Sequence, residues 1–93
     1  MKGTLPLTYA VFRYCDRDGE VCTSDVMRDL RETYASHRQF AAQKIEEILM
    51  TGVANGILDE TRYELDEDES LRTYYRATDA GRSLIRKYIG PRA

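Results

Sequence analysis

The sequence predicts a small α+β domain, mainly α, with a three-helix core, a small antiparallel hairpin and a C-terminal helix. Two observations support this prediction. Apolar residues recur at helical spacing in three successive segments of the first half of the chain. In the second half, two segments with alternating apolar residues flank a polar stretch, which is typical of a hairpin. A chain of 93 residues suits one small core, so we expect residues 1–93 to form a single domain.

The first helix is expected over residues 6–17, where Leu7 and Val11 recur at helical spacing. Gly19 is expected to end this segment in a left-handed conformation. A short extended stretch at residues 20–22 then leads to the second helix.

The second helix is expected to begin at Thr23 or Ser24, both of which can cap it, and to run to about Tyr34. Val26, Leu30 and Tyr34 form a stripe at four-residue spacing, which indicates one buried face.

The third helix is expected to begin at Ser36, because Gln39 three residues later completes a capping box. It should end between Thr51 and Ala54, before the glycine-containing segment that follows. One face of this helix is apolar and carries Ala41, Ile45, Ile48, Leu49 and Gly52. The opposite face carries Gln43, Glu47 and Met50, with Phe40 close by.

The hairpin is expected to join two strands by an acidic loop, with the following apolar residues alternating along them: Ile57, Tyr63 and Leu65, then Leu71, Thr73, Tyr75 and Ala77. Thr78 should cap the last helix, which ends at Gly90. The resulting order of elements is that of a winged helix-turn-helix.

The segment from Arg72 to Leu84, which contains Tyr75-Arg76-Ala77-Thr78-Asp79-Ala80-Gly81, resembles the end of winged-helix regulators of the PadR and MarR type. In those families the second wing strand reads tyrosine-x-leucine-threonine, then two residues, then glycine. The strand buries the aromatic residue, the threonine caps the last helix, and the glycine lets that helix pack closely. The resemblance implies a DNA-binding transcriptional regulator, and regulators of this type often form dimers through their terminal helices.

Composition and length argue against several other classes of protein. A domain of this size rarely encloses a walled active site, and no glycine-rich phosphate loop or catalytic grouping is present, so we expect no enzyme and no cofactor. No apolar run approaches the length of about 18 residues that spans a membrane, and no signal peptide precedes the first helix. We therefore expect a cytoplasmic protein.

Cys15, Cys22 and His37 do not form the pattern of a disulfide framework or a zinc site, so no metal is expected. The two cysteines are either small buried hydrophobic residues, which is usual for free cysteine, or a redox sensor.

Charge is distributed unevenly along the chain, although the formal net charge is only −2. Residues 57–70 contain seven acidic residues and only one basic residue, Arg62. Residues 71–93 contain six basic residues and only one acidic residue, Asp79. Such a split can steer a partner to one face of the molecule.

The third helix is the first candidate for contact with double-stranded DNA, since a recognition helix places its N-terminal residues at base edges. The expected base-reading residues are His37, Gln39, Phe40 and Gln43. Ser36, Arg38 and Lys44 are expected near the phosphates. The alternative is an ordinary polar helix face, on which periodicity turns Arg38 toward the core.

Arg28 and Arg31 on the second helix can hold DNA phosphates, which fix register without reading sequence. Alternatively, they form surface salt bridges with Asp25, Asp29 or Glu32.

The acidic loop Asp66–Glu69 is expected to be a solvated tip or a docking point for a basic protein partner, and to point away from DNA. Arg72 and Arg76 either reach DNA or pair across the hairpin with Glu60 or Glu64.

The terminal helices carry more aromatic and apolar surface than a small core needs, and we expect a homodimer there. The expected interface residues are Tyr9, Phe12, Tyr14, Tyr88 and Ile89. The alternative is that these side chains only close the core of the monomer.

The leading hypothesis is a homodimeric transcriptional regulator that binds specific double-stranded DNA with helix 36–51 in the major groove. The rival hypothesis is a winged-helix module that binds a protein through the acidic hairpin and the same helix. The rival is supported by a sequence pI near 5.4 and by Glu46 and Glu47 on the expected recognition helix.

Overall fold

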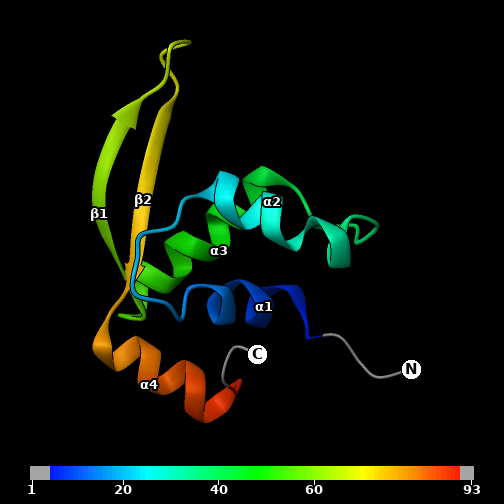
Figure 1. Ribbon diagram of the computed structural model, residues 1–93, viewed down its shortest axis with the longest axis vertical. Helices are drawn as coiled ribbons and strands as arrows, with labels where there is room; N and C mark the ends of the chain where they lie inside the picture. The colour runs from blue at the N-terminus through cyan, green and yellow to red at the C-terminus, as the bar shows by residue number, and fades with distance from the viewer. Residues whose placement is uncertain (1–4, 91–93) are drawn as a thin grey trace.

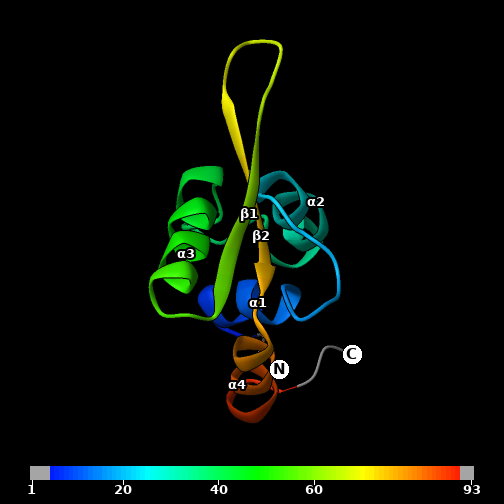
Figure 2. The same ribbon diagram turned by 90° about the vertical axis from the view of Figure 1, so that its left-hand side faces the viewer.

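The computed structural model describes residues 5–90 and contains the helices and strands in the predicted order. The elements are α1 (Leu7–Tyr14), α2 (Thr23–Tyr34), α3 (Ala42–Ala54), β1 (Leu58–Leu65), β2 (Leu71–Ala77) and α4 (Asp79–Tyr88). Helices α1, α2 and α3 gather beside one half of the hairpin, while its other half extends beyond them (Figure 1). Figure 2 shows α2 and α3 on either side of the hairpin, with α4 at the end of the molecule opposite the hairpin tip.

The core lies where the first three helices meet the base of the hairpin. Val11, Val26, Ile45 and Leu49 are 0% exposed, and each comes from the predicted apolar face of its helix. Full burial of one such side chain contributes about 1.5–3 kcal/mol, so this cluster supplies much of the driving force for folding.

Helix α1 ends at Tyr14, three residues earlier than predicted. The Cys15 N–H donates to both Val11 O and Phe12 O, and the Arg17 N–H donates to Cys15 O, so the chain tightens and turns. Gly19 does not adopt the left-handed conformation predicted for it; among the described glycines, Gly56 and Gly90 do.

The hairpin is antiparallel, with Leu58 opposite Ala77 at its base and Leu65 opposite Leu71 at its tip. A bulge lies between Glu60 and Arg62 and interrupts the alternation on β1. The prediction for this strand was therefore wrong in detail: Leu58 is its buried residue, whereas Leu65 is 71% exposed. The outer half of the hairpin lies beyond the helices, so no core covers its apolar residues.

Tyr75 joins β2 to the segment before α2. Its N–H donates to Val21 O and its carbonyl accepts from the Val21 N–H, both at 2.8 Å. This single bridge makes the predicted extended stretch a partial third strand.

Thr78 caps α4 as predicted. Its Oγ1 accepts a hydrogen bond from the Gly81 N–H at 2.8 Å and donates to Gly56 O at 2.9 Å. The backbone of Gly81 lies so close to the start of β1 that an added Cβ would be 2.0 Å from Ile57 O. The predicted role of this glycine in close packing is therefore confirmed.

A buried carboxylate anchors the other side of α4. The Asp16 side chain is 3% exposed and accepts hydrogen bonds from Arg82 Nε at 3.0 Å and Arg86 Nε at 2.9 Å. The bond from Arg86, followed by that from Arg82, lowers the pKa of Asp16 against the opposing effect of burial. Arg82 also pairs with exposed Asp18 at 2.7 Å.

We expect Gly81→Ala to lower the free energy of unfolding by about 1–3 kcal/mol, because the new methyl group collides with backbone that cannot rotate away. Urea unfolding followed by circular dichroism measures this loss. Ser83→Ala, at an exposed position of the same helix, should change stability by less than about 0.5 kcal/mol. Equal stability of the two variants would contradict the close approach.

We expect Asp16→Asn to lower the free energy of unfolding by about 2 kcal/mol at pH 7, because two charge-assisted hydrogen bonds lose their acceptor charge. The folded-state pKa of Asp16 is lowered, so its stabilising effect is present above the unfolded pKa of about 3.9. It is lost as the pH falls from there through the folded pKa. Urea titrations at several pH values should show the two proteins converging in acid, and a difference independent of pH would contradict this role.

Candidate nucleic-acid interface

Helices α2 and α3 form the helix-turn-helix unit, but α3 begins later than predicted. Residues 35–41 form the turn, and the first residue of α3 is Ala42. Ser36 therefore caps no helix, and the expected recognition helix 36–51 is replaced by α3 at Ala42–Ala54. The prediction failed because the Ser36–Gln39 pattern lies in the turn, where other hydrogen bonds hold the backbone.

His37 organises this turn. Its N–H donates to Tyr34 O at 2.9 Å, its carbonyl accepts from the Phe40 N–H at 3.0 Å, and its Nδ1 accepts from the Gln39 N–H at 3.2 Å. The His37 ring also meets the edge of Tyr34, with centroids 6.0 Å apart. These contacts replace the helical bonds that a capping box would require.

The N-terminus of α3 has no side-chain cap. Ala41 is the N-cap residue and has no hydrogen-bonding side chain, and no acidic residue lies in the first turn. The first N–H groups of a helix have no partner within the helix, so those of Ala42, Gln43 and Lys44 can donate hydrogen bonds to an anion.

Helix α3 buries one face and exposes the other. Ile45, Ile48 and Leu49 are buried, as predicted from their spacing. The exposed face is marked by Gln43, Glu47 and Met50, as the sequence pattern predicted. Gln43 lies near the helix N-terminus, the part of a recognition helix that contacts base edges in the major groove, and Glu47 and Met50 follow it along the same face.

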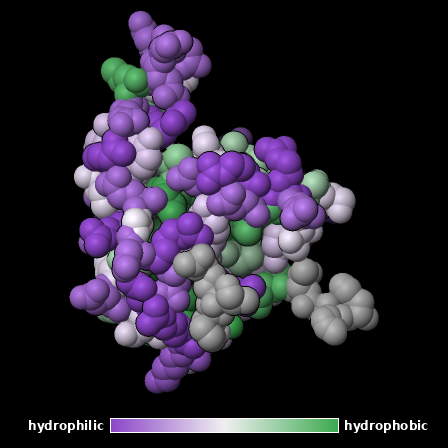
Figure 3. Space-filling model, in the orientation of Figure 1, coloured by the Kyte–Doolittle hydropathy of each residue, from purple (hydrophilic) through white to green (hydrophobic). Residues whose placement is uncertain are grey.

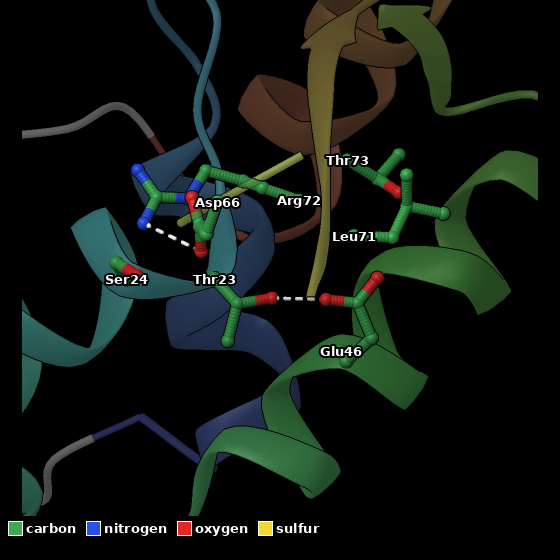
Figure 4. A pocket seen from close by; sticks show the side chains of 7 residues that line it. All are labelled: Thr23, Ser24, Glu46, Asp66, Leu71, Arg72 and Thr73. Carbon is green, nitrogen blue, oxygen red and sulfur yellow. Dashed lines mark hydrogen bonds and ion pairs between the residues drawn. The ribbon is translucent and has the colours of Figure 1, made fainter. Parts of the chain in front are cut away.

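Glu46 does not belong to the exposed face of α3. Its carboxylate accepts hydrogen bonds from the Thr23 hydroxyl at the start of α2 and from the Tyr75 hydroxyl on β2. Figure 4 shows Glu46 reaching from α3 toward Thr23 in a small polar pocket that Arg72 and Asp66 also line. The pKa of Tyr75 is raised, first by burial and then by this carboxylate. Glu46 is one of the two acidic residues of α3 that argued against DNA binding, and its carboxylate is instead hydrogen-bonded to α2 and β2.

The two arginines on α2 differ. Arg28 pairs with Asp29 at 2.8 Å and with Asp25 at 3.4 Å, which is the salt-bridge alternative. Arg28, followed by the Tyr14 hydroxyl, lowers the pKa of Asp29. Arg31 is exposed, and no ion pair within residues 5–90 involves it.

The predicted residues of the turn are mostly on the surface. Ser36, His37, Arg38 and Gln39 are exposed. Arg38 does not face the core, because the turn breaks the periodicity that predicted this orientation. Phe40 is half-buried and packs against the core, so its ring is less available to a thymine methyl group than predicted.

The wing is acidic, and of its seven carboxylates only Glu64 and Asp66 form ion pairs within residues 5–90. Arg62 pairs with Glu20 and Glu64. Of the two alternatives for Arg72, contact with DNA or a pair across the hairpin, the structure contains a pair across the hairpin, but its partner is Asp66 at 3.3 Å and not Glu60 or Glu64. Figure 3 shows hydrophilic residues covering the extended end of the hairpin, with an exposed apolar residue among them. Leu65 and Leu71, which face each other across the strands, are both more than 60% exposed.

An apolar groove of about 260 Å³ lies between α1 and α4. Its lining consists of Tyr9, Phe12, Ile57, Leu84, Ile85, Tyr88 and Ile89. Tyr9, Leu84 and Tyr88 are exposed by 50%, 44% and 71%. Tyr14 lies elsewhere: it is buried and donates to Asp29 Oδ2 at 2.5 Å, so it cannot belong to a dimer surface here. Sequence reasoning missed Leu84, although its spacing of four residues from Tyr88 indicated it.

The comparisons with known proteins add one structural relationship. No family profile matches this chain, and no similar sequence is found among curated proteins. Among solved structures, the chain is similar to PadR of Bacillus subtilis, in its crystal structure in complex with operator DNA, with a TM-score of 0.70. The match covers 94% of this chain at 18% sequence identity. The fold is a winged helix-turn-helix.

The structural match confirms the predicted fold class, and the likeness to PadR agrees with the predicted PadR-type resemblance. The matched region covers 48% of the PadR chain, so this chain spans about half of that protein's length. At 18% identity the likeness concerns the fold, and function must be argued from the residues of this chain.

The remaining candidates are the two cysteines and groups of metal-ligating side chains. Cys15 and Cys22 are buried and unbridged, and burial raises the pKa of the Cys15 thiol to about 12, which disfavours a reactive thiolate. Over residues 5–90, no group of three metal-ligating side chains comes together. None of the described helices is long and apolar enough to cross a membrane.

Proposed function

We propose that this protein is a transcriptional regulator that binds specific double-stranded DNA as a homodimer, with α3 in the major groove. The observation that carries the proposal is the N-terminal end of α3. There an uncapped helix terminus, the exposed polar side chain of Gln43 and the exposed turn with Arg38 lie together on one surface. Helix-turn-helix proteins use this end of the recognition helix to reach bases and adjacent phosphates.

Phosphate contacts in this proposal come from the free N–H groups of the first turn of α3 and from nearby cations. Arg31 and Arg38 are exposed and have no ion pair within the described chain, so they can approach phosphates without breaking one. Lys44 Nζ lies 4.0 Å from a Glu47 carboxylate oxygen. An exposed ion pair at this distance is weak, so Lys44 loses little attraction to Glu47 when its side chain turns toward DNA. Arg28 is less suited, since it must first leave Asp25 and Asp29.

The wing tip lies outside the proposed DNA interface. Residues 66–69 are four consecutive acidic side chains, and phosphates would repel them. DNA affinity must then come from the helix-turn-helix unit without the help of a basic wing.

The α1–α4 groove is the proposed dimer interface. Tyr9, Leu84 and Tyr88 expose apolar surface at its rim, and a small domain gains burial by covering such surface. A two-fold arrangement through this face would present two α3 helices to successive half-sites, which lie about 34–36 Å apart on DNA.

We expect the wild-type protein to bind random-sequence duplex DNA in fluorescence anisotropy, with affinity falling steeply between about 50 and 200 mM salt. Gln43→Ala combined with Lys44→Ala should weaken binding to a selected site by about tenfold and reduce the salt dependence by about one phosphate contact. Ser83→Ala, at an exposed position of α4 that does not line the α1–α4 groove, should bind like wild type.

Absence of DNA binding by the wild type at low salt would overturn the proposal. The acidic hairpin, with its exposed Leu65 and Leu71, would then be tested as a protein-binding element by neutralising residues 66–69.

We expect Leu84→Glu to convert the dimer to a monomer, because a charge at the rim of the groove opposes burial against a second copy. Light scattering during size-exclusion chromatography measures the mass, and circular dichroism checks that the fold is retained. Leu71→Glu, at a leucine of the wing that is 62% exposed, should leave the dimer intact. A wild-type protein that is monomeric at high concentration, or a dimer unaffected by Leu84→Glu, would contradict this interface.

A further inference from the structure

Of the two acidic residues of α3, Glu47 is the one whose carboxylate accepts no hydrogen bond within residues 5–90. Its side chain is 58% exposed and lies one turn after Gln43 on the exposed face of the helix. Its one ion pair within the described chain is with Lys44 Nζ, at 4.0 Å. Thr51 donates to the backbone carbonyl of Glu47 and not to its side chain. No hydrogen bond within residues 5–90 reaches the carboxylate oxygens, so they remain open to another donor.

Glu46 and Glu47 are neighbours in the sequence, but their side chains lie on different sides of α3. Glu46 turns inward and accepts hydrogen bonds from Thr23 and Tyr75, whereas Glu47 points outward from the surface that carries Gln43. A negative charge in the middle of a DNA-facing surface weakens attraction to every phosphate. Such a charge is favourable on DNA only where a base offers a donor that compensates for it.

The major groove offers a carboxylate one suitable base. An ionised carboxylate only accepts hydrogen bonds. Guanine presents the acceptors O6 and N7, thymine presents the acceptor O4, and adenine places its N6 donor beside the acceptor N7. Cytosine presents its N4 amino group as a donor without an acceptor of its own in that groove.

Resting on the proposed function, we infer that Glu47 is a specificity-determining residue that accepts a hydrogen bond from the N4 amino group of a cytosine in the operator half-site. Glutamine pairs with adenine through two hydrogen bonds, so Gln43 is suited to an adenine. Four helical residues span about 6 Å along the axis, which is less than two base-pair steps of about 3.4 Å. The half-site therefore holds an adenine and a cytosine about two base pairs apart.

Glu47 also acts against the wrong sites. Guanine or thymine in place of the cytosine sets an acceptor against the carboxylate, and non-specific DNA places a compensating donor at this position only by chance. The exposed carboxylate therefore lowers non-specific affinity as well as selecting one base, which suits a protein whose net charge is already negative.

The test is selection of binding sites from a random duplex pool with the full chain, followed by anisotropy on the selected site and on single-pair variants of it. For the wild type, replacing the selected cytosine by thymine should weaken binding by about tenfold. Glu47→Ala should reduce this discrimination to about twofold or less and raise non-specific affinity. Glu47→Gln should shift the preferred base at that position to adenine, because an amide can both donate and accept.

Two controls separate base reading from effects of charge and of Lys44. Asp68→Asn removes one negative charge from the wing tip, which is outside the proposed interface, and should leave the base preference unchanged. Lys44→Ala removes the ion-pair partner of Glu47 and should weaken binding at all sites while keeping the preference for cytosine. Circular dichroism of each variant confirms that it is folded.

The outcomes are distinguishable from those for the proposed function. A wild-type protein that selects a DNA site whose base preferences are unchanged in Glu47→Ala and Glu47→Gln overturns this inference and leaves DNA binding intact. Loss of the cytosine preference in Lys44→Ala also overturns it, since Glu47 would then act only by positioning Lys44. A wild type that binds no DNA overturns both.

Discussion

The arrangement of the whole domain depends on the burial of Tyr75. Its side chain is 1% exposed, its backbone pairs with Val21, and its hydroxyl donates to Glu46 on α3. One residue of β2 therefore contacts the segment before α2, the wing and the candidate recognition helix. Because Glu46 also accepts from Thr23, the start of α2 and the middle of α3 are held at a fixed distance from the sheet. These bonds connect α2 and α3 to β2 and to each other, and so determine which faces of the two helices point outward.

This central contact also determines which charges of α3 are available outside. The negative charge of Glu46 is used within the fold, so the surface of α3 is less acidic than its sequence indicates. The same reasoning applies to α2, where Arg28 is engaged by Asp25 and Asp29 and contributes less positive charge than its exposure suggests. The positive charge that the helix-turn-helix unit leaves available to a partner thus lies on Arg31, in the turn and at the start of α3, and a simple count of charged residues does not reveal it.

Periodicity and turn chemistry predicted the number and order of the elements, since burial of one apolar face governs both helices and strands. They failed at the start of α3, because Ser36 and Gln39 have the spacing of a capping box while the real N-cap, Ala41, carries no side-chain signal. They also failed where a long-range contact decides the outcome. The inward turn of Glu46 depends on Tyr75, twenty-nine positions away. The buried position of Tyr14 depends on Asp29, and no local pattern encodes either pairing.

The attachment of α4 has a consequence for the geometry of any pair of these domains. The helix is held at its start by the contact between Gly81 and Ile57, and along its length by the buried carboxylate of Asp16. Two separated points of attachment prevent it from swinging about either one. In a two-fold assembly through α4, the distance between the two α3 helices would then be fixed. It would be set by packing within each chain and would not change with the length of a flexible linker.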